Sequence, residues 1–340
     1  MGRFNVQAGL KKLTQAGKKS KLLNIAIVLA GMIVIAMAAS PNFLTKFNLQ
    51  SVVRDLAFVS IIATGQSCLL LLGELDLSVG KMASLSGVLA GIMMVQLGFH
   101  PAPVLVVCLL LGGIFGLLNG TIITRLRLNA MVVTIGMQGL YGGINLVLTK
   151  GKAIINIPQS IQFLGKGDLL GIPMPFVFTV IILLLVLFIT QKTVFGRYIY
   201  AIGNSRDAAE ILGINVTFVR TLTYGLVGVL SAFAGILMVA RLGASQPSIG
   251  DAWPMNSIAA SVIGGVALTG GIGNPAGALL GACIISIIQN MIVLLGVNVY
   301  WQTAVSGVVV VLAISFDSIG IIIQNRAARR RALAANKERI

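Results

Sequence analysis

The sequence predicts an all-α, polytopic membrane protein, and three observations support this fold class. Of the 340 residues, 57% are hydrophobic and only 10% are charged, whereas a soluble domain has about 25% charged residues. The apolar residues gather in runs close to the ~20 residues that a helix needs to cross a bilayer. The chain also contains 40 glycines, which suit helices that pack backbone to backbone in lipid.

Ten candidate spans follow one another along the chain. Glycines interrupt the third and the eighth, which predicts discontinuous or re-entrant helices there. The eighth is the shortest, and its ends are the least defined. The ten runs are Leu22–Ala39, Leu56–Leu72, Met82–Leu97, Val104–Ile123, Met131–Leu148, Phe176–Thr190, Leu222–Val239, Ile258–Leu268, Gly277–Leu295 and Thr303–Ile323.

The basic residues predict how these spans are oriented. With the N-terminus inside, most of the 25 Lys and Arg residues fall on the cytoplasmic side, as the positive-inside rule requires. An even number of spans places the C-terminus inside as well. The chain then divides into a basic cytoplasmic N-terminus (1–21), a transmembrane region (22–323) and a basic cytoplasmic tail (324–340). The net charge of +16 therefore indicates membrane topology rather than nucleic-acid binding, which would need a basic face with interleaved aromatic residues.

A weak internal repeat relates spans two to five to spans seven to ten. Gly73 and Gly80 match Gly243 and Gly250 at one constant offset. Five spans separate the two copies, so the copies are predicted to cross the membrane in opposite directions. Inverted repeats of this kind are common in transporters, and they place the transport pathway at the interface between the copies.

The most informative polar stretch is a short helix predicted within the cytoplasmic loop 191–219. Asn204 or Ser205 can cap its start, and Asp207 lies in the first turn, where the helix dipole favours a carboxylate. Gly213 is a natural end, because glycine adopts the left-handed conformation that follows a last turn.

This capped helix has little to bury between two spans, so we expect it to dock a soluble partner; a solvated connector is the alternative. Ala208 and Ala209 would form a flat contact face, with polar side chains around it. The predicted docking residues are Asn204, Ser205, Arg206, Asp207, Ala208, Ala209, Glu210 and Gly213.

The sequence predicts no catalytic site and no cofactor or metal site in this chain. It lacks a phosphate-binding G-x-x-x-x-G-K-[ST] loop, so ATP and Mg would have to be bound by another polypeptide. Its single histidine, His100, is expected in a loop, and Cys68, Cys108 and Cys283 lie in apolar runs without metal-ligand spacing.

In several segments the sequence resembles the permease subunits of bacterial sugar ATP-binding-cassette (ABC) transporters, the ribose and galactose permease family. The resemblance covers nearly the whole chain after residue 22. Glu74 stands where members of this family usually have a small residue, and Asn256 replaces a usual acidic residue. The segments that carry the resemblance are Gly73–Gly80, Phe195–Gly203, Ala208–Ala209, Gly213–Val216, Ser257–Ala260, Gly264–Gly265, Thr269–Gly271 and Tyr300–Gln302.

The resemblance implies a permease homodimer in the bacterial cytoplasmic (inner) membrane. A cytoplasmic ATP-binding subunit would dock on 204–213, where the coupling helix of the family lies, and would drive alternating access. An extracytoplasmic sugar-binding protein would deliver the sugar, and we expect it to dock on outer loops near Gln246–Trp253.

Polar side chains in or beside the spans fit a path for a neutral polyhydroxyl solute. Amides donate and accept hydrogen bonds without net charge, as a sugar requires. For each residue taken singly, interhelical hydrogen bonding is the alternative, and Asp76 or Ser78 can instead cap the third span. The predicted path residues are Gln66, Asp76, Ser78, Asn119, Gln138, Asn145, Asn256, Asn290 and Gln302.

Two other functions stay open. The same mechanism could carry a nucleoside, a polyol or a furanosyl signal molecule, and nothing in the sequence excludes these solutes. A stand-alone secondary transporter would need titratable or cation-coordinating residues inside the spans, and the sequence offers few.

Overall fold

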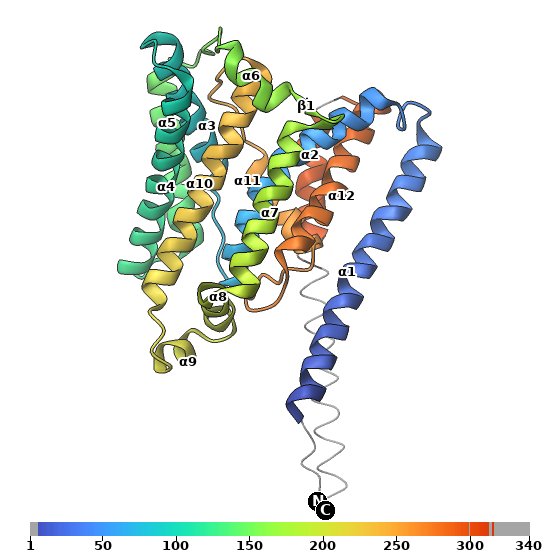
Figure 1. The fold of residues 1–340 in the computed structure, drawn as a ribbon, viewed down its shortest axis with the longest axis vertical. Helices are drawn as coiled ribbons and strands as arrows, with labels where there is room; N and C mark the ends of the chain where they lie inside the picture. Colours follow the sequence, from blue (N-terminus) through green and yellow to red (C-terminus); the bar gives the residue numbers. More distant parts are fainter. Residues whose placement is uncertain (1–5, 299, 313–314, 316–340) are drawn as a thin grey trace, which may run out of the picture.

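The computed structural model describes residues 6–298, 300–312 and 315, which form a bundle of helices with one small β-hairpin (Figure 1). The helices are α1 (Val6–Ala39), α2 (Lys46–Leu71), α3 (Val79–Gly91), α4 (Pro101–Arg125), α5 (Ala130–Thr149), α6 (Gln159–Lys166), α7 (Met174–Lys192), α8 (Val194–Asn204), α9 (Arg206–Ile211), α10 (Val216–Leu242), α11 (Trp253–Ile263) and α12 (Pro275–Leu294). A π-helical turn (Ile92–Gln96) extends α3, and β1 (Asp168–Leu169) pairs antiparallel with β2 (Ile172–Pro173).

The prediction of a polytopic all-α membrane protein is confirmed. Among the described residues, seven helices are long and apolar enough to cross a membrane, and they correspond to predicted spans two to seven and nine. The first predicted span coincides with the apolar helical segment Leu23–Ala39, and the eighth with α11. The tenth begins in the helix Trp301–Leu312, and the rest of it lies outside the described residues. The count of ten therefore stays a prediction.

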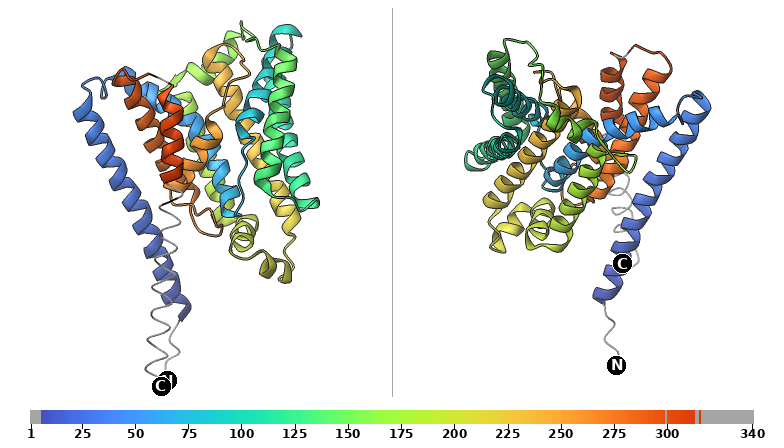
Figure 2. Two further views of the ribbon diagram at one scale, coloured as in Figure 1. Left: turned by 180° about the vertical axis from the view of Figure 1, so that it is seen from behind. Right: turned by 45° about the horizontal axis from the view of Figure 1, so that its top comes forward.

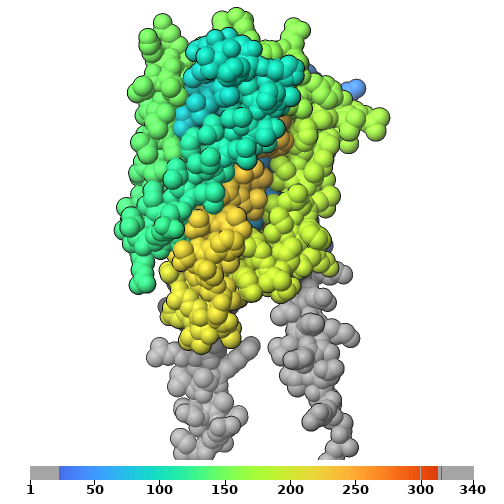
Figure 3. Space-filling model, turned by 60° about the vertical axis from the view of Figure 1, so that its left-hand side comes forward, coloured from blue at the N-terminus to red at the C-terminus, as the bar shows by residue number. Residues whose placement is uncertain are grey.

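The two central helices are α2 and α10, which bury most of their apolar surface. Around them, α4, α5 and α7 expose large apolar side chains such as Leu110, Val147 and Phe188. A belt of exposed apolar residues suits lipid rather than water as the surrounding solvent. Figure 3 shows α4 and α5 (teal and green) forming one outer face, below which the lower part of α10 (yellow) reaches the surface.

Glycines allow α4 and α10 to pack with their backbones in contact. A Cβ atom on Gly116 would collide with the carbonyl oxygen of Tyr224, and one on Gly228 would collide with the carbonyl oxygen of Gly112. Small residues permit such close approach between membrane helices. The hydroxyls of Thr124 and Thr221 add a 3.1 Å hydrogen bond between the same two helices. We call this pair the α4–α10 unit.

Two non-helical segments enter the bundle from opposite ends. Segment 72–78 joins α2 to α3, and segment 243–252 joins α10 to α11. Each contains a glycine with a left-handed backbone within two residues of the end of the preceding helix, Gly73 (φ 76°) and Gly243 (φ 70°). The backbones of Gly80 and Gly250 are in contact, as repeat counterparts beside a common axis would be. The relation between the two copies as a whole stays a prediction.

The bundle has two ends, which we name the α9 end and the α6 end. Helices α8 and α9 lie at the same end as the start of α1, whereas α6, the β-hairpin and the connection from α1 to α2 lie at the other (Figure 1). Both views in Figure 2 show α1 leaning away from the bundle towards the α9 end. Its C-terminal part packs against α12 through Ala36 and Ile287. The predicted cytoplasmic placement of the N-terminus and of the 191–219 loop stays a prediction.

Candidate transport cavity and docking helix

The predicted short helix in the 191–219 loop is present as α9, and Ser205 is its N-cap. The Ser205 Oγ accepts a hydrogen bond from the backbone N–H of Ala208 at 3.3 Å, and Asp207 lies in the first turn. Gly213 follows with a left-handed backbone (φ 78°), as predicted. Asn204 instead ends α8, and its side chain donates a hydrogen bond to the Tyr200 carbonyl.

The predicted docking face of α9 needs a correction. Ala208 is exposed, but Ala209 is buried and belongs to the same hydrophobic cluster as Val216. Successive helix residues point about 100° apart, so the two alanines cannot share one face. The side chains that project from this end are Ile211 and Leu212, which are 85% and 78% exposed. Two large apolar residues directly before a helix-ending glycine are the sequence signal that would have identified them.

A cavity of about 720 Å³ lies at the α6 end, between the first part of α2, the start of α11 and the end of α12. Three predicted path residues, Asn256, Asn290 and Gln302, line it. The amides of Asn290 and Asn48 exchange hydrogen bonds of 2.8 and 3.1 Å. The Gln302 Nε2 donates a hydrogen bond to the Gln289 carbonyl at 3.3 Å.

Two polar atoms in this cavity have no hydrogen-bond partner among the described residues. They are the Asn256 Oδ1 and the Ser286 Oγ, whose residues are only 3% and 4% exposed. Leaving such buried groups unpaired costs about 1–3 kcal/mol each, and a solute or water that reached them would relieve that cost. The Asp55 carboxylate at the cavity wall is already neutralised by Arg241. The cavity therefore offers neutral donors and acceptors, which is the chemistry a sugar needs.

An aromatic pair forms part of the cavity wall. The rings of Trp253 and Phe58 stack at a centroid distance of 6.1 Å and an angle of 9°. The Arg241 guanidinium lies 5.4 Å from the centroid of the Phe58 ring, close enough for a cation–π interaction. These contacts fix the cavity wall between α2, α10 and α11.

Three other predicted path residues form a buried network apart from the cavity. The Asp76 carboxylate accepts hydrogen bonds from the Ser78 backbone N–H at 2.7 Å and from the Asn119 side chain at 3.1 Å. Asn119 in turn accepts a 2.9 Å hydrogen bond from the Tyr141 hydroxyl. Because these groups satisfy one another, they fix segment 72–78 against α4 and α5. Ser78 is the N-cap residue of α3, but neither its side chain nor that of Asp76 makes a capping hydrogen bond, so these residues hold the segment before the helix rather than cap it.

The last three predicted path residues are dispersed. Gln66 is fully buried in α2, and its side chain has no hydrogen-bond partner among the described residues. Asn145 donates a hydrogen bond to Ser84 inside the bundle. Gln138 lines a separate groove beside the 2.6 Å ion pair of Lys81 and Asp251. The nine predicted residues therefore do not share one cavity. The sequence shows which polar residues lie in the spans, but it does not show which of them line a path and which bond one helix to another.

Sequence reasoning also missed residues that the cavity uses. Asn48, Ser51, Asp55, Ser286 and Gln289 line it and were not predicted as path residues. Ser286, Gln289 and Asn290 recur at helical spacing on α12, and that polar stripe in an otherwise apolar span was an available signal.

This fold and this site define a class: a multi-spanning helical permease that contains a neutral polar cavity. Residues 48–314 match the family described as the permease component of branched-chain amino acid transport systems. The chain belongs to this permease family.

Curated relatives extend over most of the chain. It is 35% identical to the ribose import permease RbsC of Bacillus subtilis (strain 168), over 84% of this chain and 89% of that relative. It is 34% identical to the ribose import permease RbsC of Escherichia coli (strain K12), over 86% and 92% respectively. The L-arabinose ABC transporter permease AraH of Azospirillum brasilense is 32% identical, over 86% and 84%. No solved structure matches the chain. The resemblance to sugar permeases that the motifs indicated is confirmed.

Proposed function

We propose that this chain is the membrane-spanning permease subunit of an ATP-driven importer for a small neutral sugar. The observation that carries the proposal is the neutral polar cavity at the α6 end, with the unpaired Asn256 and Ser286 oxygens inside it. The capped, exposed helix α9 at the opposite end supports it. Relatives named as ribose and arabinose permeases point to the same class of solute.

The proposal assigns partners to the two ends. The α9 end faces the cytoplasm, where a separate ATP-binding subunit holds ATP and Mg and docks on α9. The α6 end faces outward in the bacterial inner membrane and receives the sugar from an extracytoplasmic binding protein. A second copy of the chain completes a homodimer. This chain contributes no catalytic step of its own.

Alternating access links the two ends. Sugar enters the cavity at the α6 end and exchanges hydrogen bonds with water for bonds with amides and hydroxyls. Because delivery and selection belong to the binding protein, the permease needs only modest affinity. ATP-driven closure of the docked subunits moves α9, and with it the helices that close the inner side.

The test is sugar uptake by vesicles that contain the permease, its ATP-binding subunit and its binding protein. We expect the double variant Asn256→Ala with Ser286→Ala to take up labelled ribose or arabinose about tenfold more slowly. Two solute hydrogen bonds, at ~0.5–1.5 kcal/mol each, are lost, and ~1.4 kcal/mol is a factor of ten. The control is Gln138→Ala, which lies in the separate groove.

The experiment tests the location of the transport path and the permease function separately. Unchanged uptake in the double variant, with a loss in Gln138→Ala, would move the path to the groove. Absence of sugar uptake and of any bound ATP-binding subunit in the wild type would instead refute the permease function itself.

A further inference from the structure

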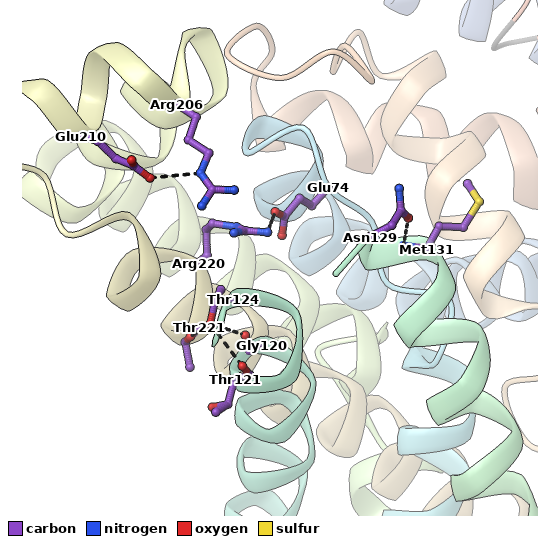
Figure 4. Close-up of polar contacts among 10 residues, drawn as sticks. All are labelled: Glu74, Gly120, Thr121, Thr124, Asn129, Met131, Arg206, Glu210, Arg220 and Thr221. Carbon is purple, nitrogen blue, oxygen red and sulfur yellow. Dashed lines mark hydrogen bonds and ion pairs between the residues drawn. The ribbon is translucent and has the colours of Figure 1, made fainter. Parts of the chain in front are cut away.

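A buried ion pair joins segment 72–78 to the first turns of α10. The Arg220 Nη2 contacts the Glu74 Oε1, and the two side chains are only 7% and 13% exposed. Figure 4 shows Glu74 reaching from its segment towards Arg220 on the neighbouring helix. The other ion pairs of the described residues are far more exposed. This pair therefore differs in kind from a surface salt bridge.

The stability of the folded segment does not explain why this ion pair is present. The Arg220 Nε and Nη1 and the Glu74 Oε2 have no hydrogen-bond partner within the described residues. A buried ion pair that is incompletely hydrogen-bonded is a poor source of stability, because desolvation offsets the attraction between its charges. Segment 72–78 is in any case already fixed through Asp76 and Asn119. The pair can instead serve to select one arrangement of segment 72–78 over others, rather than to stabilise the fold.

A short, hydrogen-bonded turn connects the docking helix α9 to the part of α10 that contains Arg220. The backbone N–H groups of Gly213 and Ile214 donate hydrogen bonds of 3.0 Å to the carbonyls of Glu210 and Ala209. This tight turn leads directly into α10, and Arg220 lies about one turn from its start. In Figure 4, Arg206 of α9 lies beside Arg220 and is paired with Glu210. A displacement of α9 would therefore carry Arg220 with it.

Segment 72–78 lies between two bodies that could move relative to each other. On one side it is tied to the α4–α10 unit, through Glu74 to Arg220 and through Asp76 to Asn119. On the other side the backbone of Gly73 lies against Thr269 and Gly270 in the connection between α11 and α12. The Leu71 carbonyl, at the end of α2 just before the segment, accepts a 2.8 Å hydrogen bond from the Gly271 N–H of the same connection. Those two helices form part of the cavity wall.

We infer that Glu74 and Arg220 are a positioning pair that makes segment 72–78 move with α9. The force of the docked ATP-binding subunit then reaches the connection between α11 and α12, and through it the cavity. The inference rests on the proposed function and names the side chains that this function uses for coupling.

The decisive variant removes both charges together. Glu74→Leu with Arg220→Met keeps similar volume and leaves no unpaired charge in the interior, and such replacements are often neutral or stabilising. We expect the complex to assemble and to hydrolyse ATP, while sugar uptake per ATP hydrolysed falls about tenfold, within the usual size of coupling effects. The charge-reversed pair, Glu74→Arg with Arg220→Glu, should recover part of that loss.

A matched control exists at the other end of the molecule. Arg54 and Asp168 form a 3.0 Å ion pair between α2 and β1. Removing it by Arg54→Met with Asp168→Leu should leave uptake per ATP unchanged.

Two results would overturn the inference. One is a double-neutral variant with wild-type uptake per ATP, which would show that the pair transmits nothing. The other is a double-neutral variant that loses thermal stability or the ATP-binding subunit, which would make the pair structural. Failure of the proposed function can be told apart from failure of this inference, because the wild type itself would then not take up sugar. That result would also remove the basis of the positioning pair.

Discussion

Gly228→Ala is expected to prevent stable folding or to lower strongly the melting temperature of the protein in detergent. The added Cβ would collide with the carbonyl oxygen of Gly112 and would lie 2.9 Å from the backbone nitrogen of Gly116. Backbone atoms of a packed helix cannot turn aside as a side chain can. Overpacking costs ~1–3 kcal/mol and sometimes more, and a collision with backbone belongs at the upper end of that range.

The control for this prediction is Gly136→Ala on α5. No atom lies within 4 Å of a Cβ at that position, and Ala is a better helix former than Gly by about 1 kcal/mol. We expect Gly136→Ala to melt at or above the wild-type temperature. Equal melting temperatures for the two variants would mean that α4 and α10 are not in backbone contact in the membrane.

The importance of this contact extends beyond stability. The α4–α10 unit continues into α9 at one end, and it holds segment 72–78 through Arg220 and Asn119. A rigid unit can transmit a push over its length, whereas loosely packed helices would absorb it. The glycines therefore support coupling by keeping two helices in one body.

Hydropathy predicted the middle of each span well and its polar ends poorly. Helix α7 runs from Met174 to Lys192, close to the predicted 176–190, because that span is apolar throughout. Helix α2 begins at Lys46 rather than at the predicted Leu56. The missed part contains Asn48 and Asp55, which line the cavity. An apolar-run criterion excludes polar residues, and a transport cavity in a membrane protein is built from polar residues.

The same bias explains two further differences. Helix α10 begins at Val216 rather than Leu222, and the missed turns include the buried Arg220. Helix α11 begins at Trp253 rather than Ile258, and the missed turn includes Asn256. Asn256 lines the candidate cavity, and Arg220 forms the buried ion pair with Glu74. The pairing of Glu74 with Arg220 could not be predicted from the sequence, because it depends on how an unwound segment folds back against α10.

Replacing the exposed tip of α9 with acidic residues is expected to abolish binding of the ATP-binding subunit while the permease stays folded. The variant is Ile211→Asp with Leu212→Asp. Both side chains are largely exposed, so their replacement disturbs little of the permease itself. An anchor residue at the hot spot of an interface contributes about 2 kcal/mol or more (~30-fold) to binding, and two unpaired carboxylates in the same pocket add a desolvation cost. The measurement is co-purification of the ATP-binding subunit from mild detergent.

Two alanines of the same helix provide the controls. Ala208→Arg alters an exposed rim position and should weaken the association only in part. Ala209→Arg forces a charge into the cluster that holds α9 against α10, so we expect loss of folded permease rather than selective loss of the partner. Full retention of the ATP-binding subunit by Ile211→Asp with Leu212→Asp would show that docking uses another surface of the α9 end. A selective loss would identify the apolar tip of α9 as the surface on which the ATP-binding subunit docks and through which ATP hydrolysis drives the permease. Ser205 and Gly213 define the two ends of the helix that presents this tip.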